Sequence, residues 1–326
     1  MTPRERLLTA LRGGMTDRLP PDRAHLTTEQ RNPRTMDLHR LSVAECVKRL
    51  QEEDRTVPAA LRRARPALTA FIAAAAVRFR AGGRLIYLGA GTSGRLGVLD
   101  ASEAPPTFQV EPERVVGLIA GGDAALRRSS EGQEDDPRGA RAELEALALT
   151  PRDTLLGVAA GGTTPYVFGA LEIAKELQPR MLTGLLVCSP MPKPRAADHL
   201  VVIPTGPEAL TGSTRLKAGT ATKSALNTIS TTLMIQAGRV YQNLMVDLRA
   251  TNAKLRDRAA RIVGQLTGLG RAACFRLLDR AGGAVKTAVV MRRRRLKREA
   301  AEALLAACGG RLEKALEERS RKRRSR

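Results

Sequence analysis

The sequence is poor in aromatic side chains, which make up 2% of its 326 residues and include no Trp. Single-stranded nucleic acid is usually held by stacking its bases on aromatic rings, so a stacking platform is excluded. The core must therefore be aliphatic. With 43% hydrophobic residues, a chain of this length holds either one large domain or a large domain with a small partner.

Cysteine and histidine are also scarce and scattered, and no CxxC pair occurs: Cys46, Cys188, Cys274, Cys308, His25, His39 and His199. Such spacing suggests neither a disulfide framework nor a zinc knuckle. It also argues against a histidine-based metal site or catalytic triad. We expect no metal and no cofactor.

Long hydrophobic runs are missing as well. The start, MTPRERLLTALRGG, lacks the apolar centre of a signal peptide, and the longest apolar run, 71–77, is too short to cross a bilayer. We therefore expect a cytoplasmic protein with no membrane partner.

Positive charge, in contrast, is in excess: the formal net charge is +22. Residues 291–326 hold 14 Lys and Arg against 5 Asp and Glu. Patches of this kind bind nucleic acid nonspecifically, or they are simply a solvated surface. The solvated surface with a frayed basic tail is the favoured interpretation.

The most informative segment is 85–108, LIYLGAGTSGRLGVLDASEAPPTF. A short apolar strand is followed by a glycine turn, by the hydroxyls of Thr92 and Ser93, and by a helix expected from Gly94 onward. Free N–H groups at a helix start favour an anion such as phosphate. The segment matches neither a Walker loop nor a full dinucleotide fingerprint, and a tight turn that binds nothing is the alternative.

Five strand candidates follow one another in the middle of the chain, at 84–89, 115–120, 154–160, 182–188 and 200–204. Helices are expected mostly between and around them, at 58–80 with a break or kink at Pro66, at 137–148 with Pro137 in the first turn, at 165–177 and at 213–236. Apolar strands alternating with helices predict an α/β fold with a doubly wound parallel sheet, which binds ligands at the carboxyl ends of its strands. From Leu255 onward, three or four short helices separated by glycines are expected.

Five blocks, in order, resemble the N-acetylmuramic acid 6-phosphate etherase family: 26–38, 89–108, 117–136, 205–223 and 243–259. The resemblance implies a sugar isomerase (SIS) fold with a five-stranded sheet, a small C-terminal helical (UBA-like) domain, a homodimer and no metal. The implied domains are an N-terminal segment 1–57, an SIS sugar-phosphate domain 58–250, a helical domain 251–318 and a basic tail 319–326. The implied reaction converts N-acetylmuramate 6-phosphate into N-acetylglucosamine 6-phosphate and D-lactate, in cell-wall sugar recycling.

The resemblance also implies the site residues. Glu103, in DASEAPP, and Glu134, in EGQEDD, match the two catalytic glutamates, without a secure assignment of acid and base; Glu103 is favoured as the proton donor or shuttle at the sugar. Substrate and phosphate contacts are expected from Thr92, Ser93, Gly94, Gly161, Thr163, Glu208, Ser213 and Lys217. Ser213 is equally explained as a helix cap, and one of Arg215 and Lys217 as the ion-pair partner of Glu208.

The sequence departs from the family in its third glycine loop, which reads AAGGTTP at 159–165, where the family usually has AASGRTP. A serine hydroxyl and an arginine are lost, which puts phosphate affinity in question. The alternative to an enzyme is therefore a non-catalytic sugar-phosphate sensor, like the related vertebrate glucokinase regulatory protein. Retention of both Glu103 and Glu134 favours the enzyme.

Overall fold

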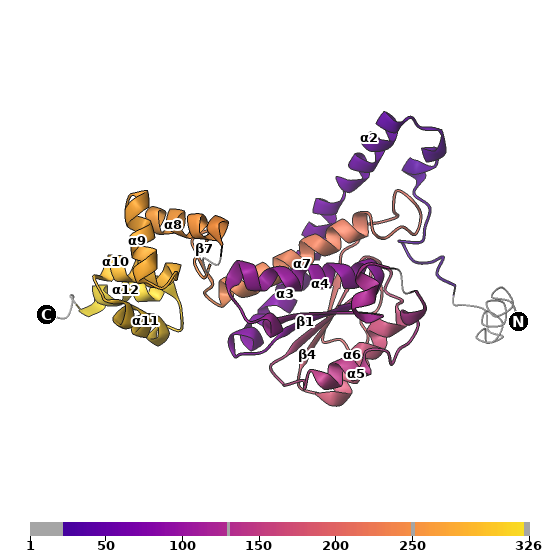
Figure 1. Ribbon diagram of the computed structural model, residues 1–326. Coiled ribbons are helices and arrows are strands. Elements are labelled where there is room, and N and C mark those ends of the chain that lie inside the picture. Colours follow the sequence, from indigo (N-terminus) through magenta and orange to yellow (C-terminus); the bar gives the residue numbers. More distant parts are fainter. Residues whose placement is uncertain (1–21, 129–130, 249–251, 323–326) are drawn as a thin grey trace, which may run out of the picture.

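The computed structural model describes residues 22–128, 131–248 and 252–322. At its centre lies a five-stranded parallel sheet with the strand order β2-β1-β3-β4-β5 (Figure 1). The strands are β1 (Leu85–Gly89), β2 (Val115–Ile119), β3 (Thr154–Val158), β4 (Leu182–Val187) and β5 (His199–Val202). Because all five are parallel, their carboxyl ends lie along the same edge of the sheet. The predicted fold class and all five strands are confirmed.

Helices cover both faces of this sheet. They are α3 (Val57–Arg80), α4 (Gly91–Phe108), α5 (Arg141–Ala146), α6 (Pro165–Leu177) and α7 (Lys217–Gln236). Helices α3, α4 and α7 share a core with Leu85 and Tyr87, whereas α5 and α6 share the opposite core with Ile86 and Leu88. Successive strand residues point to opposite faces, so one apolar strand contributes to both cores.

Four helix predictions differ in detail from the structure. Helix α3 continues through Pro66, which is exposed, so water can bond the carbonyl that the missing N–H leaves free. Helix α4 begins at Gly91 rather than Gly94. Helix α5 spans only Arg141–Ala146, so Pro137 does not open it, and α7 begins at Lys217 rather than Ser213.

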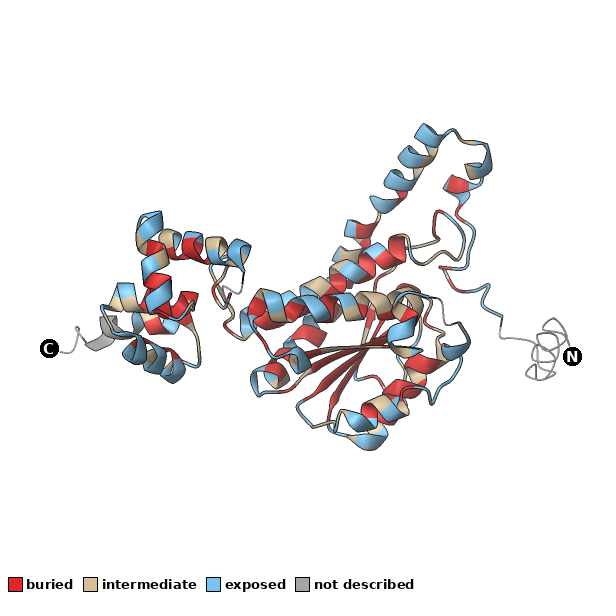
Figure 2. Ribbon diagram, in the orientation of Figure 1, coloured by how far each residue is buried: buried red, intermediate tan, exposed pale blue. Residues whose placement is uncertain are grey.

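The N-terminal part forms an arm that projects from the sheet domain (Figure 1). It contains two 3₁₀ helices, η1 (Pro33–Thr35) and η2 (Leu38–Arg40), and α2 (Val43–Asp54). Helix α2 starts with a capping box, in which Ser42 and Glu45 each bond the other's backbone N–H. Most of α2 is exposed (Figure 2), including the apolar side chains Val43, Val47 and Leu50.

The C-terminal part is helical and has its own aliphatic core (Figures 1 and 2). A hairpin of β6 (Val240–Tyr241) and β7 (Leu244–Met245) leads into α8 (Ala253–Thr267), α9 (Arg271–Arg280), α10 (Val285–Arg294), α11 (Arg298–Ala307) and α12 (Leu312–Lys322). These five helices exceed the three or four expected. The extra break has no glycine, because Arg295 itself adopts the left-handed conformation, with φ 56°, that ends α10.

Short 3₁₀ helices complete the described elements: η3 (Pro112–Arg114), η4 (Gly122–Leu126) and η5 (Glu131–Gln133). In the part of the chain that the structure describes, no helix is long and apolar enough to cross a membrane.

Candidate active site

The predicted anion cradle lies where β1 passes into α4. Gly91, with φ +51°, opens the helix, and Thr92 and Ser93 follow in its first turn, both half-buried. Ala90 at the N-cap provides no side-chain cap, and N–H groups at the start of a helix favour an anion. The turn is so tight that a Cβ on Gly94 would stand 2.6 Å from the carbonyl oxygen of Gly89, which explains the glycine.

The start of α7 lies beside this cradle. A Cβ on Gly219, in the first turn of α7, would lie 3.7 Å from Cγ2 of Thr92. Two helix N-termini, each with a positive dipole end, thus face the same edge of the sheet. Ser213 is half-buried in the loop before α7, but it does not cap the helix, whose N-cap is Leu216.

Glu208 instead caps the start of α7. Its carboxylate accepts the backbone N–H groups of Lys217 and Ala218, both at 2.9 Å, and the residue is fully buried. Burial raises the pKa of Glu208, while the two N–H bonds act in the opposite direction. The negative charge is therefore placed at a helix N-terminus, where it is favourable.

The Lys217 side chain is engaged elsewhere, in a buried ion pair with Glu53 of α2. The Nζ–Oε2 distance is 2.7 Å, and the two side chains are 1% and 3% exposed. Glu53 also accepts hydrogen bonds from Arg34, at 2.6 and 2.7 Å, and from Asn32, at 2.7 Å. Burial alone would raise the pKa of Glu53, but these bonds outweigh it and lower the pKa to about 2. This cluster ties the N-terminal arm to the start of α7.

A second buried polar cluster fixes α4 against α7. The Tyr87 hydroxyl on β1 donates to Asp100 of α4 at 2.9 Å. Asn227 and Ser230 of α7 donate to the other oxygen of Asp100 at 2.6 and 3.2 Å. Burial, together with the Asp100 carboxylate, raises the pKa of Tyr87 well above its ordinary value. The two helix starts that face the cradle are therefore held in a fixed relation.

The third glycine loop, after β3, meets the N-terminal segment. A Cβ on Gly161 would lie 3.6 Å from the hydroxyl of Thr28 and 3.8 Å from that of Thr163. Thr28 is fully buried: its N–H donates to Ser189 Oγ at 3.3 Å, and the Ser189 hydroxyl donates to Thr28 Oγ1 at 3.3 Å. Two hydroxyl groups and Cδ1 of Leu26, at 3.9 Å, thus border the place where a side chain at 161 would stand.

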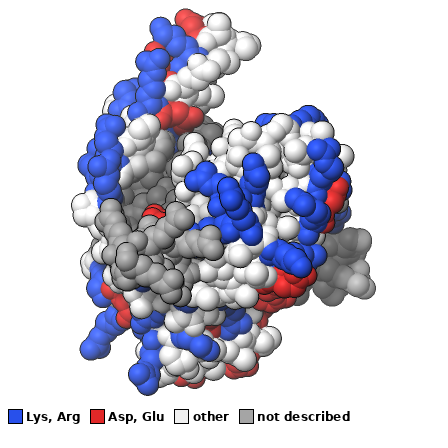
Figure 3. Space-filling model, turned by 90° about the vertical axis from the view of Figure 1, so that its left-hand side faces the viewer, with Lys and Arg blue, Asp and Glu red and all other residues white. Residues whose placement is uncertain are grey.

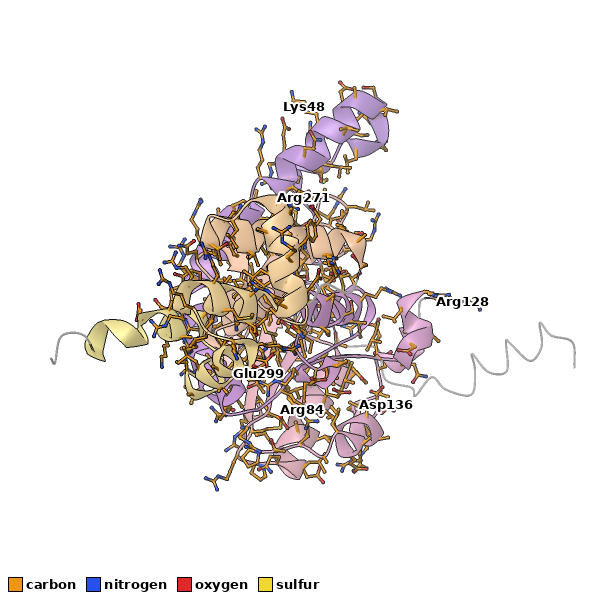
Figure 4. All side chains as sticks on the ribbon, turned by 60° about the vertical axis from the view of Figure 1, so that its left-hand side comes forward. Lys48, Arg84, Arg128, Asp136, Arg271 and Glu299 are labelled. Carbon is orange, nitrogen blue, oxygen red and sulfur yellow. The ribbon has the colours of Figure 1, made fainter. Side chains whose placement is uncertain are left out.

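Glu134 lies directly at the cradle. Its Oε1 would be 3.1 Å from a Cβ on Gly91, and its carbonyl accepts the N–H of Tyr166 at the start of α6, at 3.0 Å. Arg95 of α4 donates a hydrogen bond to the backbone carbonyl of Arg128, which precedes Glu134 in the chain, at 3.2 Å. Figure 4 shows Arg128 and Asp136 on the same side of the molecule, at either end of the stretch that carries Glu134.

Glu103 does not join this group within one chain. It lies 12 positions after Gly91 on α4, which corresponds to about 18 Å along the helix axis. The side chain is exposed, and no hydrogen bond or ion pair links it to another residue of the described ranges. Leu99, one turn earlier on the same face, is 51% exposed.

The described residues contain no group of three or more His, Cys, Asp or Glu side chains that could hold a metal ion. The arrangement is a glycine turn and a helix start, which favours an anion, with one carboxylate at its edge. The structure brings three of the predicted residues, Thr92, Ser93 and Glu134, to the start of α4. Sequence reasoning missed Glu53, which carries no motif, and Thr28, which lies in the resembling block 26–38 but was not assigned to the site.

Comparisons with known proteins show the family of the chain. Residues 68–175 match the family described as the glucokinase regulatory protein N-terminal SIS domain. A relative from Gloeobacter violaceus, named N-acetylmuramic acid 6-phosphate etherase, is 50% identical over 94% of this chain and 99% of its own. Relatives with the same name from Pectobacterium atrosepticum and Caldanaerobacter subterraneus are 50% and 47% identical, each over 89% of this chain and over 96% and 95% of their own.

Among solved structures, a phosphoheptose isomerase from Francisella tularensis aligns with 60% of this chain and 97% of its own, with a TM-score of 0.40 and 16% identity.

Proposed function

Because the chain belongs to the N-acetylmuramic acid 6-phosphate etherase family, we propose that it cleaves the D-lactyl ether of N-acetylmuramate 6-phosphate. The products are N-acetylglucosamine 6-phosphate and D-lactate, and the process served is recycling of cell-wall sugars in the cytoplasm. The single observation that best supports this is the position of the Glu134 carboxylate at the start of α4, because it places a carboxylate beside a helix N-terminus that favours an anion.

The reaction proceeds by elimination followed by hydration. In the open-chain sugar, the C1 aldehyde acidifies the proton on C2. A base removes that proton, the C3–O bond breaks, and an acid protonates the departing lactate oxygen. Water then adds at C3 and a proton returns to C2. Two positioned carboxylates provide this proton transfer, each contributing about 10²–10⁴-fold.

The phosphate is assigned to the cradle and to the neighbouring loops. Thr92, Ser93 and Gly94 would hold it with hydroxyl and N–H groups, with Gly161 and Thr163 on one side. Ser213, in the loop before α7, is assigned to the opposite side of the same edge. The start of α4 supports this placement, since a helix N-terminus favours a negative charge, and the start of α7, which Glu208 caps, lies beside it.

Glu208 and Lys217 are assigned a role in shaping the site. Their charged groups are buried and bonded to the start of α7 and to Glu53. Their contribution to binding is therefore to hold the α7 N-terminus in place.

Glu134 is assigned as the base at C2, because the positive end of α4 stabilises its negative charge. Glu103 is assigned as the acid at the lactate oxygen. About 18 Å of helix separates Glu103 from the cradle of its own chain, so it would have to act in the site of a second copy. We therefore propose a homodimer in which the exposed face of α4 around Leu99 and Glu103 meets the partner.

The domain division stays part of this proposal: an arm to residue 57, an SIS domain at 58–250, a helical domain at 251–318 and a basic tail at 319–326. The separate aliphatic core of the C-terminal helices supports the boundary near 250.

The alternative is a sugar-phosphate sensor without catalysis, favoured only by the altered loop at 161–163. Incubation of the protein with N-acetylmuramate 6-phosphate, followed by an enzymatic assay for D-lactate, separates the two. The enzyme releases D-lactate, whereas Glu134→Gln, a nearly isosteric change, should bind the sugar phosphate but release at least about 100-fold less D-lactate per unit time. Tight binding by the unaltered protein without D-lactate release would establish the sensor.

A further inference from the structure

The C-terminal helices form a basic groove, with a cavity of about 1000 Å³ between α9, the end of α10 and the start of α11. Its charged lining consists of Arg276, Arg280, Arg292, Arg295, Lys297 and Arg298, with Asp279 and Glu299 as the acids. Figure 3 shows that Lys and Arg side chains outnumber acidic ones on the face turned toward the viewer.

Most of these cations have no counter-ion. Asp279 is paired with Arg256 at 2.7 Å, and Arg298 is paired with Glu302 at 2.8 Å. Among the side chains that the structure describes, no ion pair or hydrogen bond involves the remaining five: Arg276, Arg280, Arg292, Arg295 and Lys297. Arg261 and Arg271, in contrast, both pair with Asp257.

The start of a helix also lines the groove. Helix α11 has 10 residues, its N-cap Lys297 makes no side-chain cap bond, and its first residues line the cavity. The positive end of its dipole therefore adds to the five unpaired cations. Arg276 and Arg280 are four residues apart on α9, so their guanidinium groups extend from the same face of the helix.

The chemistry of the lining limits the occupant. No aromatic side chain lines the groove, and Phe275 nearby lies under the guanidinium groups of Arg256 and Arg271, at 5.6 and 5.0 Å. Unpaired bases would stack on aromatic rings, which the lining lacks. Its apolar residues lie among the cations: Leu269, Ala273, Leu277, Met291 and Leu296. Guanidinium forks instead match phosphate oxygens, and cations distributed over three helices match a row of phosphates rather than a single one.

We propose that this groove binds the phosphodiester backbone of double-stranded nucleic acid without reading its sequence. Five phosphate contacts predict a salt slope of about −4.5 for the logarithm of the binding constant. The affinity should then fall about 500-fold between 50 and 200 mM salt.

The test is fluorescence anisotropy of the full chain with labelled duplex DNA of two unrelated sequences. Arg276→Gln/Arg280→Gln should reduce the slope to about −2.7, so that the loss over the same salt range is only about 40-fold. The matched control is Arg261→Gln/Arg271→Gln, which removes the same charge from the same helical region. Figure 4 places Arg271 and Glu299 at opposite ends of that region.

Retained circular dichroism and D-lactate release show that each variant is folded. The proposal is supported if the protein binds both sequences with equal affinity and if the groove variant, but not the control variant, loses duplex affinity and has a reduced salt slope. It is overturned if the control weakens binding as much as the groove variant, or if deletion of Ser320 to Arg326 alone abolishes binding. Tighter binding of poly-glutamate than of duplex at the same salt would also overturn it, by assigning the groove to an acidic protein.

Discussion

The two catalytic glutamates should complement each other between subunits. Within one chain, Glu134 lies at Gly91, whereas Glu103 is 12 positions further along α4, or about 18 Å along its axis. A glutamate side chain is too short to bridge this distance, so one sugar cannot contact both glutamates of one chain. Glu103→Ala and Glu134→Ala should therefore each lower turnover by at least about 100-fold as pure dimers.

Mixing the two inactive variants should restore activity. After subunit exchange at equal amounts, half of the dimers are mixed. Each mixed dimer has one site with both glutamates and one site with neither. The expected activity is about a quarter of that of the unaltered protein, because two-fold symmetry gives each dimer two equivalent sites.

The assay is the rate of D-lactate release after exchange, with the subunit ratio checked by mass spectrometry. As a control, either single variant is mixed with Glu103→Ala/Glu134→Ala, which should restore nothing. If the two single variants stay inactive although mixed dimers are present, the glutamates act within one chain and the assignment of Glu103 to the partner's site is refuted.

Three further changes have defined outcomes. Gly161→Ser should lower KM by about 10- to 100-fold with little change in kcat. The loop has room for a Cβ, and the added hydroxyl can bond the charged phosphate of the substrate. A raised KM in steady-state kinetics would show that the loop needs glycine. The pKa of Glu53 falls from 4.5, its ordinary value, to about 2 in the folded protein. Its contribution to the free energy of unfolding, up to about 3 kcal/mol, is therefore fully present above pH 4.5 and is lost as the pH falls toward 2. In urea titrations at several pH values, Glu53→Gln should remove this pH dependence, and an unchanged dependence would contradict the role of the cluster. Deletion of Ser320 to Arg326 should leave D-lactate release unchanged, and a marked loss would mean that the tail contributes to the site.

The sequence predicts the sheet and the cradle well because both depend on local signals. All five strands are short apolar runs; β1, β3 and β4 are buried, and β2 and β5 are mostly half-buried. The GAGTSG turn is typical of a strand end followed by a helix start. Glu134, found through the family motif, indeed lies at that helix start.

What sequence reasoning missed depends on contacts across long stretches of chain. Lys217 and Glu53 are 164 positions apart, and Thr28 and Ser189 are 161 apart. No local pattern indicates such pairs. The start of α7 was misplaced for the same reason, since its N–H groups are capped by Glu208 from the preceding loop and not by Ser213.

The most direct test of the proposed reaction is the fate of solvent oxygen. The protein is incubated with N-acetylmuramate 6-phosphate in water enriched in ¹⁸O, and both products are analysed by mass spectrometry early in the reaction. Elimination at C2–C3 followed by hydration predicts that the label enters N-acetylglucosamine 6-phosphate at C3 and that the ether oxygen leaves with D-lactate. Label at the C2 hydroxyl of lactate, or no release of lactate at all, would contradict the account.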